Sequence, residues 1–111
     1  ADGGVWSWGS GGFGRLGHGD EQTQRLPKKV EALEGRRVVA VSAGTGHTLA
    51  ITADGGVWSW GSGGFGRLGH GDEQTQRLPK KVEALEGRRV VAVSAGTGHT
   101  LAITADGGVW S

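Results

Sequence analysis

Residues 37–60 read RVVAVSAGTGHTLAITADGGVWSW, and this stretch decides the fold. The run from Arg37 to Ala43 is β-branched or apolar at nearly every position, which is typical of an inner strand buried on both faces. The run from His47 to Thr52 alternates large apolar side chains with small or polar ones. Asp54-Gly55 tolerates the positive φ of a tight turn, so Val57 to Trp60 returns antiparallel. The stretch predicts three consecutive antiparallel strands.

A polar fourth strand is expected after a long glycine-rich loop. The loop covers 61–78, and the run from Pro79 to Leu85 begins with proline and carries two lysines. A missing N–H and exposed lysines are typical of an edge strand. Four antiparallel strands graded from apolar to polar describe one blade of a β-propeller. A β-solenoid is the alternative, but its parallel strands do not accommodate the hairpin at Asp54-Gly55.

The same unit recurs at an offset of 52 residues, which is the separation of Trp6 and Trp58. Residues 1–59 match residues 53–111 at every position, including solvent-type positions such as Gln22 and Gln74. Such identity indicates very recent amplification or deliberate engineering, and we favour engineering. The expected fold class is therefore all-β, a β-propeller of four-stranded antiparallel blades with a 52-residue repeat.

The repeat boundaries place partial blades on either side of a complete one. Residues 1–36 hold the outer half of a blade with its connecting loop, residues 37–88 a complete blade, and residues 89–104 the inner half of another. Residues 105–111 are the surplus start of a further repeat, which we expect to be disordered or to displace its twin by strand exchange. The two halves would meet in one composite blade of a closed ring.

Two blades cannot close a ring, so we expect the partners to be identical chains or further covalent repeats. Head-to-tail contact would give six blades from three chains or eight from four, and whole two-blade chains cannot give seven. The sequence begins at Ala1 without methionine, which is expected of a processed product or a window of a longer array.

The alternating pattern also assigns an apolar core. The two tryptophans of each Trp-Ser-Trp run share a strand face, where we expect them to pack on Leu49, Ile51 or the inner-strand valines of the next blade. Stacking on a ligand is the alternative role for these rings. The expected core residues are Trp6, Trp8, Val39, Val41, Leu49, Ile51, Trp58, Trp60, Val91, Val93, Leu101 and Ile103.

Composition excludes several classes of function. The net charge is +1 with acids and bases interspersed, so no attraction to nucleic acid or to a membrane surface is expected. Cysteine is absent, which excludes disulfides and thiolate metal sites. The longest apolar run, Val38 to Val41, is far shorter than the ~20 residues of a membrane span, and no signal-like leader is visible. We expect a soluble protein, cytoplasmic or recombinantly produced.

No side-chain pattern indicates catalysis, a metal or a cofactor. The four histidines, His18, His47, His70 and His99, have only Asp20 and Asp72 near the loop pair, so structural hydrogen bonding is expected. The glycine run from Gly9 to Gly14 lacks the Lys-Ser/Thr of a phosphate loop. Ser42 lacks a nucleophile elbow. We expect no enzyme activity, no cofactor and no catalytic or metal-binding residue.

Any protein binding is expected at the loops. Alternate connections of an antiparallel meander emerge at the same end, so the long loop and the Gly44-Thr45-Gly46 turn share a face. A solvated rim with no natural partner is the alternative, because the face is small and polar. The candidate interaction residues are Ser10, Arg15, Arg25, Thr45, Ser62, Arg67, Arg77 and Thr97.

Several strings together resemble the regulator of chromosome condensation repeat, and the resemblance covers essentially the whole chain. They are Val5-Trp6-Ser7-Trp8-Gly9, Gly14-Arg15-Leu16-Gly17-His18-Gly19-Asp20, Pro27-Lys28-Lys29-Val30, Val41-Ser42-Ala43-Gly44 and His47-Thr48-Leu49-Ala50-Ile51-Thr52. The resemblance implies a propeller, commonly of seven blades, used for protein recognition. Members of this family include an exchange factor for the GTPase Ran, a plant UV-B photoreceptor and modules of ubiquitin ligases.

Those particular activities fit this sequence poorly. The exchange factor is similar in its repeats but has a wedge-like insertion, for which identical repeats have no counterpart. The photoreceptor's motif has tryptophan where Thr45 and Thr97 stand here. Ubiquitin ligation needs a separate catalytic domain. The expected function is a structural repeat scaffold, self-assembling or part of a longer symmetric propeller, and the alternative is a natural protein-interaction module of the same family.

Overall fold

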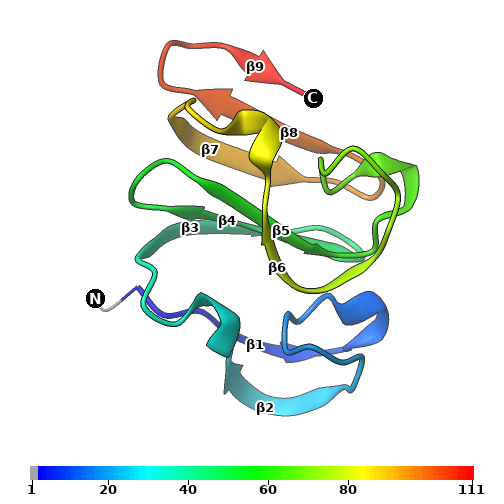
Figure 1. The fold of residues 1–111 in the computed structure, drawn as a ribbon. Helices are drawn as coiled ribbons and strands as arrows, with labels where there is room; N and C mark the ends of the chain where they lie inside the picture. The colour runs from blue at the N-terminus through cyan, green and yellow to red at the C-terminus, as the bar shows by residue number, and fades with distance from the viewer. Residues whose placement is uncertain (1–2) are drawn as a thin grey trace.

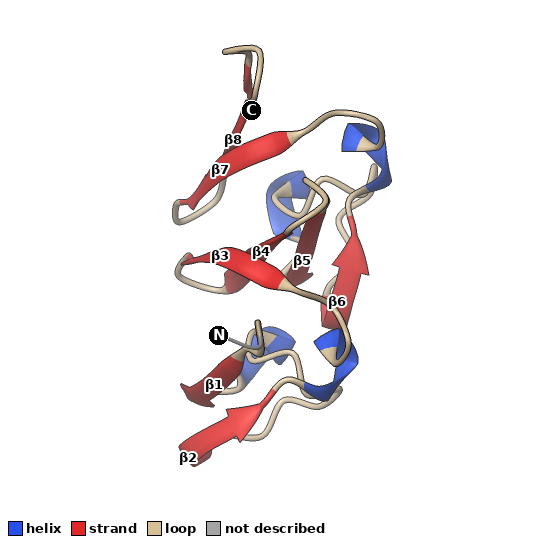
Figure 2. Cartoon of the chain, turned by 90° about the vertical axis from the view of Figure 1, so that its left-hand side faces the viewer, coloured by secondary structure: helices blue, strands red, loops and turns tan. Residues whose placement is uncertain are grey.

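The computed structural model describes residues 3–111, whose strands form three antiparallel sheets stacked one on another (Figures 1 and 2). The first sheet pairs β1 (Trp6–Gly9) with β2 (Gln24–Lys29). The second holds, in spatial order, β3 (Val38–Ala43), β4 (His47–Thr52), β5 (Val57–Gly61) and β6 (Gln76–Lys81). The third holds β7 (Val90–Ala95), β8 (Thr100–Thr104) and β9 (Val109–Trp110). The prediction of an all-β fold with antiparallel sheets is confirmed.

Each sheet is a meander, because neighbours in space are neighbours in sequence. The inner hairpin pairs Val41 with Ala50, and the turn after Thr52 is closed by a hydrogen bond from the N–H of Gly55 to the carbonyl of Thr52 (2.9 Å). The predicted segment 1–36 begins with two residues that lie outside the described part of the chain. The surplus tail is not disordered as one expectation had it, since Val109 pairs with Ile103 in β9.

The outer strands are displaced from their predicted positions. The expected strand from Pro79 to Leu85 is instead β6, which ends at Lys81, followed by the 3₁₀ turn Glu83–Leu85. The first repeat has the same 3₁₀ turn at Glu31–Leu33. In a strand, residues three apart point to opposite faces, whereas a 3₁₀ turn eclipses them. The turn therefore lets Val30 and Leu33 enter one apolar cluster.

No helix within residues 3–111 is long and apolar enough to cross a membrane.

Two apolar clusters hold the sheets together, one in each gap between them. Val30, Leu33, Ala50 and Trp60 are buried together between the first and second sheets. Between the second and third sheets the buried residues are Leu49, Ile51, Val57, Val82, Val90 and Ala102. Trp60 thus lies on the face of the second sheet opposite Leu49 and Ile51, and the expected packing of tryptophan on these residues is wrong. Cross-strand partners share a face, and Trp58 pairs with Ala50 whereas Ser59 pairs with Leu49.

Burial of the expected core depends on which sheets have neighbours. Leu49, Ile51 and Trp60 are buried, and Trp58 and Val93 are partly buried. The other expected core residues are exposed, contrary to the sequence-based expectation: Trp6, Trp8, Val39, Val41, Val91, Leu101 and Ile103. Trp6 and Trp8 lie on the outward face of the first sheet, and Leu101 and Ile103 lie on the outward face of the third. Val41 lies on the face of the second sheet that is turned toward the two-stranded first sheet. Val39 and Val91 lie where the register of the inner strand shifts, at the edge of their sheets.

Candidate interaction surfaces

Arg15 and Thr45 lie together at one end of the sheets. Arg15 leaves the long loop of the first repeat, where its Nε donates to the carbonyl of Gly12 (2.9 Å) and its Nη1 donates to the carbonyl of Thr45 (2.9 Å). The hydroxyl of Thr48 donates to the carbonyl of Arg15 in return (2.9 Å). The Arg15 side chain therefore ties the loop of one sheet to the inner hairpin of the next.

The second repeat makes the same connection. Arg67 Nη1 donates to the carbonyl of Thr97 (2.9 Å), and the hydroxyl of Thr45 donates to that of Thr97 (3.4 Å). Four of the predicted interaction residues, the two arginines and the two threonines, are thus brought together by contacts between sheets. Their polar groups are engaged in holding the sheets in place, which lowers their value as contacts for a partner.

Replacement of Arg15 by alanine will reduce the free energy of unfolding by about 1–2 kcal/mol. The variant loses two hydrogen bonds from a guanidinium, both to backbone carbonyls. Urea unfolding followed by circular dichroism measures the change. Lys28→Ala, at an exposed position of the outer strand, is the control and should change stability by less than about 0.5 kcal/mol. Equal effects of the two variants would show that Arg15 is not a tether.

The remaining predicted interaction residues lie apart from this cluster. Arg77 is on the outer strand β6, where its Nε contacts Glu21 Oε2 of the first repeat (3.0 Å). Both side chains are substantially exposed, so this ion pair adds little stability. Arg25 is exposed at the equivalent position of β2. Ser10 is exposed, and the N–H of Ser62 donates to the carbonyl of Gly46 (2.8 Å). The eight residues therefore do not form one surface.

Sequence reasoning missed an aromatic side chain on the rim. Phe13 is exposed, has a positive φ of 62°, and lies 5.7 Å from the Arg15 guanidinium. A groove of about 420 Å³ separates it from the outer strand and is also lined by Glu21, Arg77 and Leu78. Exposed aromatic residues beside arginine are typical anchors for protein partners, and positive φ at a non-glycine residue is frequent at functional sites. The signal in the sequence was a single aromatic residue among loop glycines.

Three of the four histidines make structural hydrogen bonds, as expected. His18 Nε2 lies 2.9 Å from Ser7 Oγ, and His70 Nε2 lies 2.9 Å from Ser59 Oγ. His47 Nε2 lies 3.1 Å from Thr100 Oγ1 of the next sheet. Among residues 3–111 no group of three or more histidines and carboxylates is arranged to hold a metal ion. The imidazoles join loop to strand and sheet to sheet.

Stability will fall as the pH is lowered through the histidine range. Burial lowers the pKa of His47 from its usual 6.5, and Arg67 lowers it further. Burial also lowers the pKa of His70. The unfolded chain therefore binds protons first, so stability is complete above about pH 6.5 and declines below it until the folded histidines also titrate. We expect a lower Tm at about pH 5.5 than at about pH 7.5 by calorimetry.

His47→Gln should reduce that pH dependence, because it removes a buried titrating group. Lys28→Gln, at an exposed position of the outer strand, is the control for substitution by glutamine. A Tm that is unchanged or higher at the lower pH, or an identical slope in His47→Gln, would contradict this assignment.

The stacked sheets define the class of protein. Antiparallel meanders that pack face to face through apolar clusters, with a polar strand outermost, are the blades of a β-propeller. The chain belongs to the regulator of chromosome condensation (RCC1) repeat family, whose sequence model matches residues 2–51 and again residues 54–103.

Known proteins similar to the chain are much longer. The E3 ubiquitin-protein ligase HERC2 of Homo sapiens is 46% identical over 110 residues, which cover 99% of this chain and 2% of HERC2. The crystal structure of human WBSCR16 matches with a TM-score of 0.89 at 27% identity, over 97% of this chain and 28% of that one. Prp20p of Saccharomyces cerevisiae, whose structure was described with its binding to Gsp1p and histones, matches with a TM-score of 0.80 at 27% identity, over 94% and 27%. The chain spans less than a third of each of these proteins.

Proposed function

We propose that the chain is a non-catalytic scaffold that stacks its blades against further copies of the same blade and presents its loops to protein partners. One observation carries this proposal: identical side chains are buried only where another sheet lies next to them. Leu49, which faces the third sheet, is 1% exposed, whereas Leu101 in the same place one repeat later is 37% exposed. The sheets therefore form an interface that the third sheet offers again on its outward side.

Both ends of the stack expose apolar side chains of complementary kind. Trp6 and Trp8 are exposed on the first sheet, at one end of the stack, and Leu101, Ile103 and Val109 on the third sheet, at the other end. Large exposed apolar patches on soluble proteins mark interaction sites. Further repeats of a longer chain would bury both ends, and so would head-to-tail contact of whole chains, which would close rings of three or four chains. Identity of the two repeats supports an engineered or recently amplified array with such symmetry.

Multi-angle light scattering tests the stacking. We expect the mass of the particle to increase with protein concentration from that of one chain to that of three or four. A mass of one chain throughout the range would contradict stacking between whole chains.

A natural interaction module is the second candidate, favoured by the groove beside Phe13 and by similarity to Prp20p, which binds Gsp1p and histones. A stoichiometric partner that is recovered with the wild-type chain and lost with Phe13→Ala would support this candidate.

A further inference from the structure

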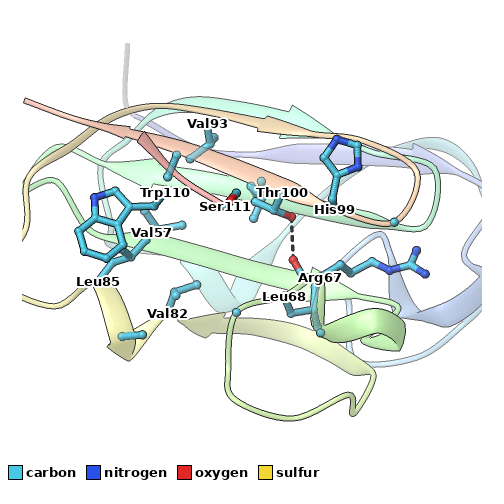
Figure 3. A pocket seen from close by; sticks show the side chains of 16 residues that line it. Val57, Arg67, Leu68, Val82, Leu85, Val93, His99, Thr100, Trp110 and Ser111 are labelled. Atoms are coloured by element: carbon cyan, nitrogen blue, oxygen red, sulfur yellow. Dashed lines mark hydrogen bonds between the residues drawn. The ribbon is translucent and has the colours of Figure 1, made fainter. Parts of the chain in front are cut away.

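His47 is the first residue of β4, and its ring is buried where the second sheet meets the third. Its Nε2 lies 3.1 Å from Thr100 Oγ1 of β8. The Thr100 hydroxyl in turn donates to the carbonyl of Arg67 (2.7 Å), and Figure 3 shows this bond as a dashed line. The three groups therefore form one chain of hydrogen bonds between the two sheets.

The order of donors in this chain assigns the proton on the neutral imidazole. A threonine hydroxyl has one proton, and the proton of Thr100 is donated to the carbonyl of Arg67, so the Thr100 oxygen accepts from His47. Nε2 therefore carries the proton of the neutral ring, and Nδ1 carries a lone pair. Because Nε2–H is present in both the neutral and the charged ring, protonation does not remove the bond to Thr100. Its effect arises at Nδ1.

Nδ1 lies against the backbone of the turn that precedes β4. It is buried, and no atom of residues 3–111 forms a hydrogen bond with it. A Cβ on Gly44 would lie 2.9 Å from Nδ1 and 2.6 Å from the carbonyl oxygen of Gly96. The φ of Gly44 is outside the left-handed region, so the close contact with the imidazole, and not backbone conformation, requires glycine here. The contact leaves little space for a further atom at this edge of the ring.

The turn from Gly44 to Gly46 joins the long loop of the first repeat to the third sheet. The carbonyl of Thr45 accepts from Arg15 Nη1 (2.9 Å), which holds the long loop. The hydroxyl of Thr45 donates to that of Thr97, in the turn between β7 and β8 (3.4 Å). A movement of this one turn would therefore affect the loop and the next sheet together.

The groups around the ring disfavour a positive charge on it. Burial is the main cause that lowers the pKa of His47 below its usual 6.5, and the Arg67 guanidinium lowers it further. A charge on His99 acts in the same direction, whereas the backbone of His99 raises the pKa. Arg15, another cation, is bonded to the adjoining turn. As the pH falls, a rearrangement that brings the ring into contact with water is therefore increasingly favoured.

We propose that His47, Gly44 and Thr45 form an acid-sensitive joint, in which a proton added at Nδ1 displaces the turn 44–46 from the imidazole. The displacement separates Thr45 from Arg15 and Thr97, while Nε2 keeps its bond to Thr100. The loop end of the sheets thus opens while the apolar clusters between the sheets remain packed. The joint would control access to the loop surface, and it depends neither on stacking of whole chains nor on a partner.

Hydrogen exchange of backbone amides, followed by NMR at about pH 7.5 and about pH 5, tests the joint. The N–H groups of Gly44 and Ser62 report on the turn, because each donates to a carbonyl of residue 46 or 47 (2.8 Å). The N–H of Gly55 is the control, since it closes the turn at the opposite end of β4 (2.9 Å). We expect the protection factors of Gly44 and Ser62 to fall by about 10-fold or more at the lower pH, and that of Gly55 to change much less.

Two variants separate this joint from other acid effects. His47→Gln should abolish the selective loss of protection at Gly44. His70→Gln is the matched control and should leave this loss unchanged, because the pKa of His70 is also lowered but its ring is bonded to Ser59 in another loop. Circular dichroism melts of both variants show that the fold is retained.

The tautomer provides a second measurement. Imidazole ¹⁵N shifts at about pH 7.5 should show the proton of neutral His47 on Nε2. A proton on Nδ1 would overturn the assignment. Equal loss of protection at Gly44 and Gly55 in acid would indicate opening of the whole hairpin, and a selective loss that persists in His47→Gln would assign it to another group. Either result would overturn the joint.

Discussion

Trp60→Ala will reduce the free energy of unfolding by about 3–5 kcal/mol, a large part of the ~5–15 kcal/mol that stabilises an ordinary domain. The Trp60 ring is 1% exposed and is enclosed by Val30, Leu33 and Ala50, so its removal leaves a cavity between the first and second sheets. Its Nε1 is buried, and no atom of residues 3–111 forms a hydrogen bond with it, so the loss is one of packing. Chemical unfolding at a concentration where the chain is monomeric measures the effect.

Trp8→Ala is the matched control, because the residue and its local sequence are the same. Trp8 is 58% exposed, and the monomer should lose about 1 kcal/mol or less. Trp60→Phe should cost less than Trp60→Ala, since it keeps a six-membered aromatic ring in the cluster and removes the buried N–H. Equal losses for Trp8→Ala and Trp60→Ala in the monomer would contradict the placement of Trp60 in the core.

The sequence was sufficient to predict the inner three strands of the complete blade. Residue alternation and the Asp54-Gly55 turn predict β3, β4 and β5 to within a residue or so of the observed bounds. The outer strand was misplaced because its end depends on tertiary contacts. Val82 and Leu85 follow a proline-containing polar run that reads locally as an edge strand, whereas the observed turn serves the packing of Val30 and Leu33 against Trp60 in the equivalent place.

The sequence of a single repeat does not show which face of its sheet is buried. A period of two shows that Trp58 and Trp60 share a face, but the register with β4 decides which residues lie beside them. Exposure depends on a neighbour, as the different burial of Trp8 and Trp60 shows. The prediction of the loop surface was incomplete for the same reason. Arg15 and Thr45 were correctly placed at one end, but their mutual hydrogen bond and the exposure of Phe13 required the folded loop.

Gly63→Ala will destabilise the chain by about 3 kcal/mol through a clash inside the long loop. Gly63 has a φ of −97°, which any residue adopts, so the effect does not arise from backbone strain. A Cβ at this position would overlap the carbonyl group of Gln74 and lie 2.9 Å from the carbonyl carbon of Glu73. These are backbone atoms in the segment that returns to β6, and they cannot rotate away as a side chain would. We expect a lower Tm and a lower urea midpoint.

Gly64→Ala provides the control at the adjacent residue. A Cβ on Gly64 would meet only the ends of the Arg67 and Ser62 side chains, at 3.5 and 3.9 Å, which are ordinary contacts. Its stability should therefore stay within about 0.5 kcal/mol of the wild type. Because both substitutions add one methyl group to the same loop, their difference isolates the close approach of the two chain segments. Similar stabilities for the two variants would mean that the loop does not fold back on residues 73 and 74.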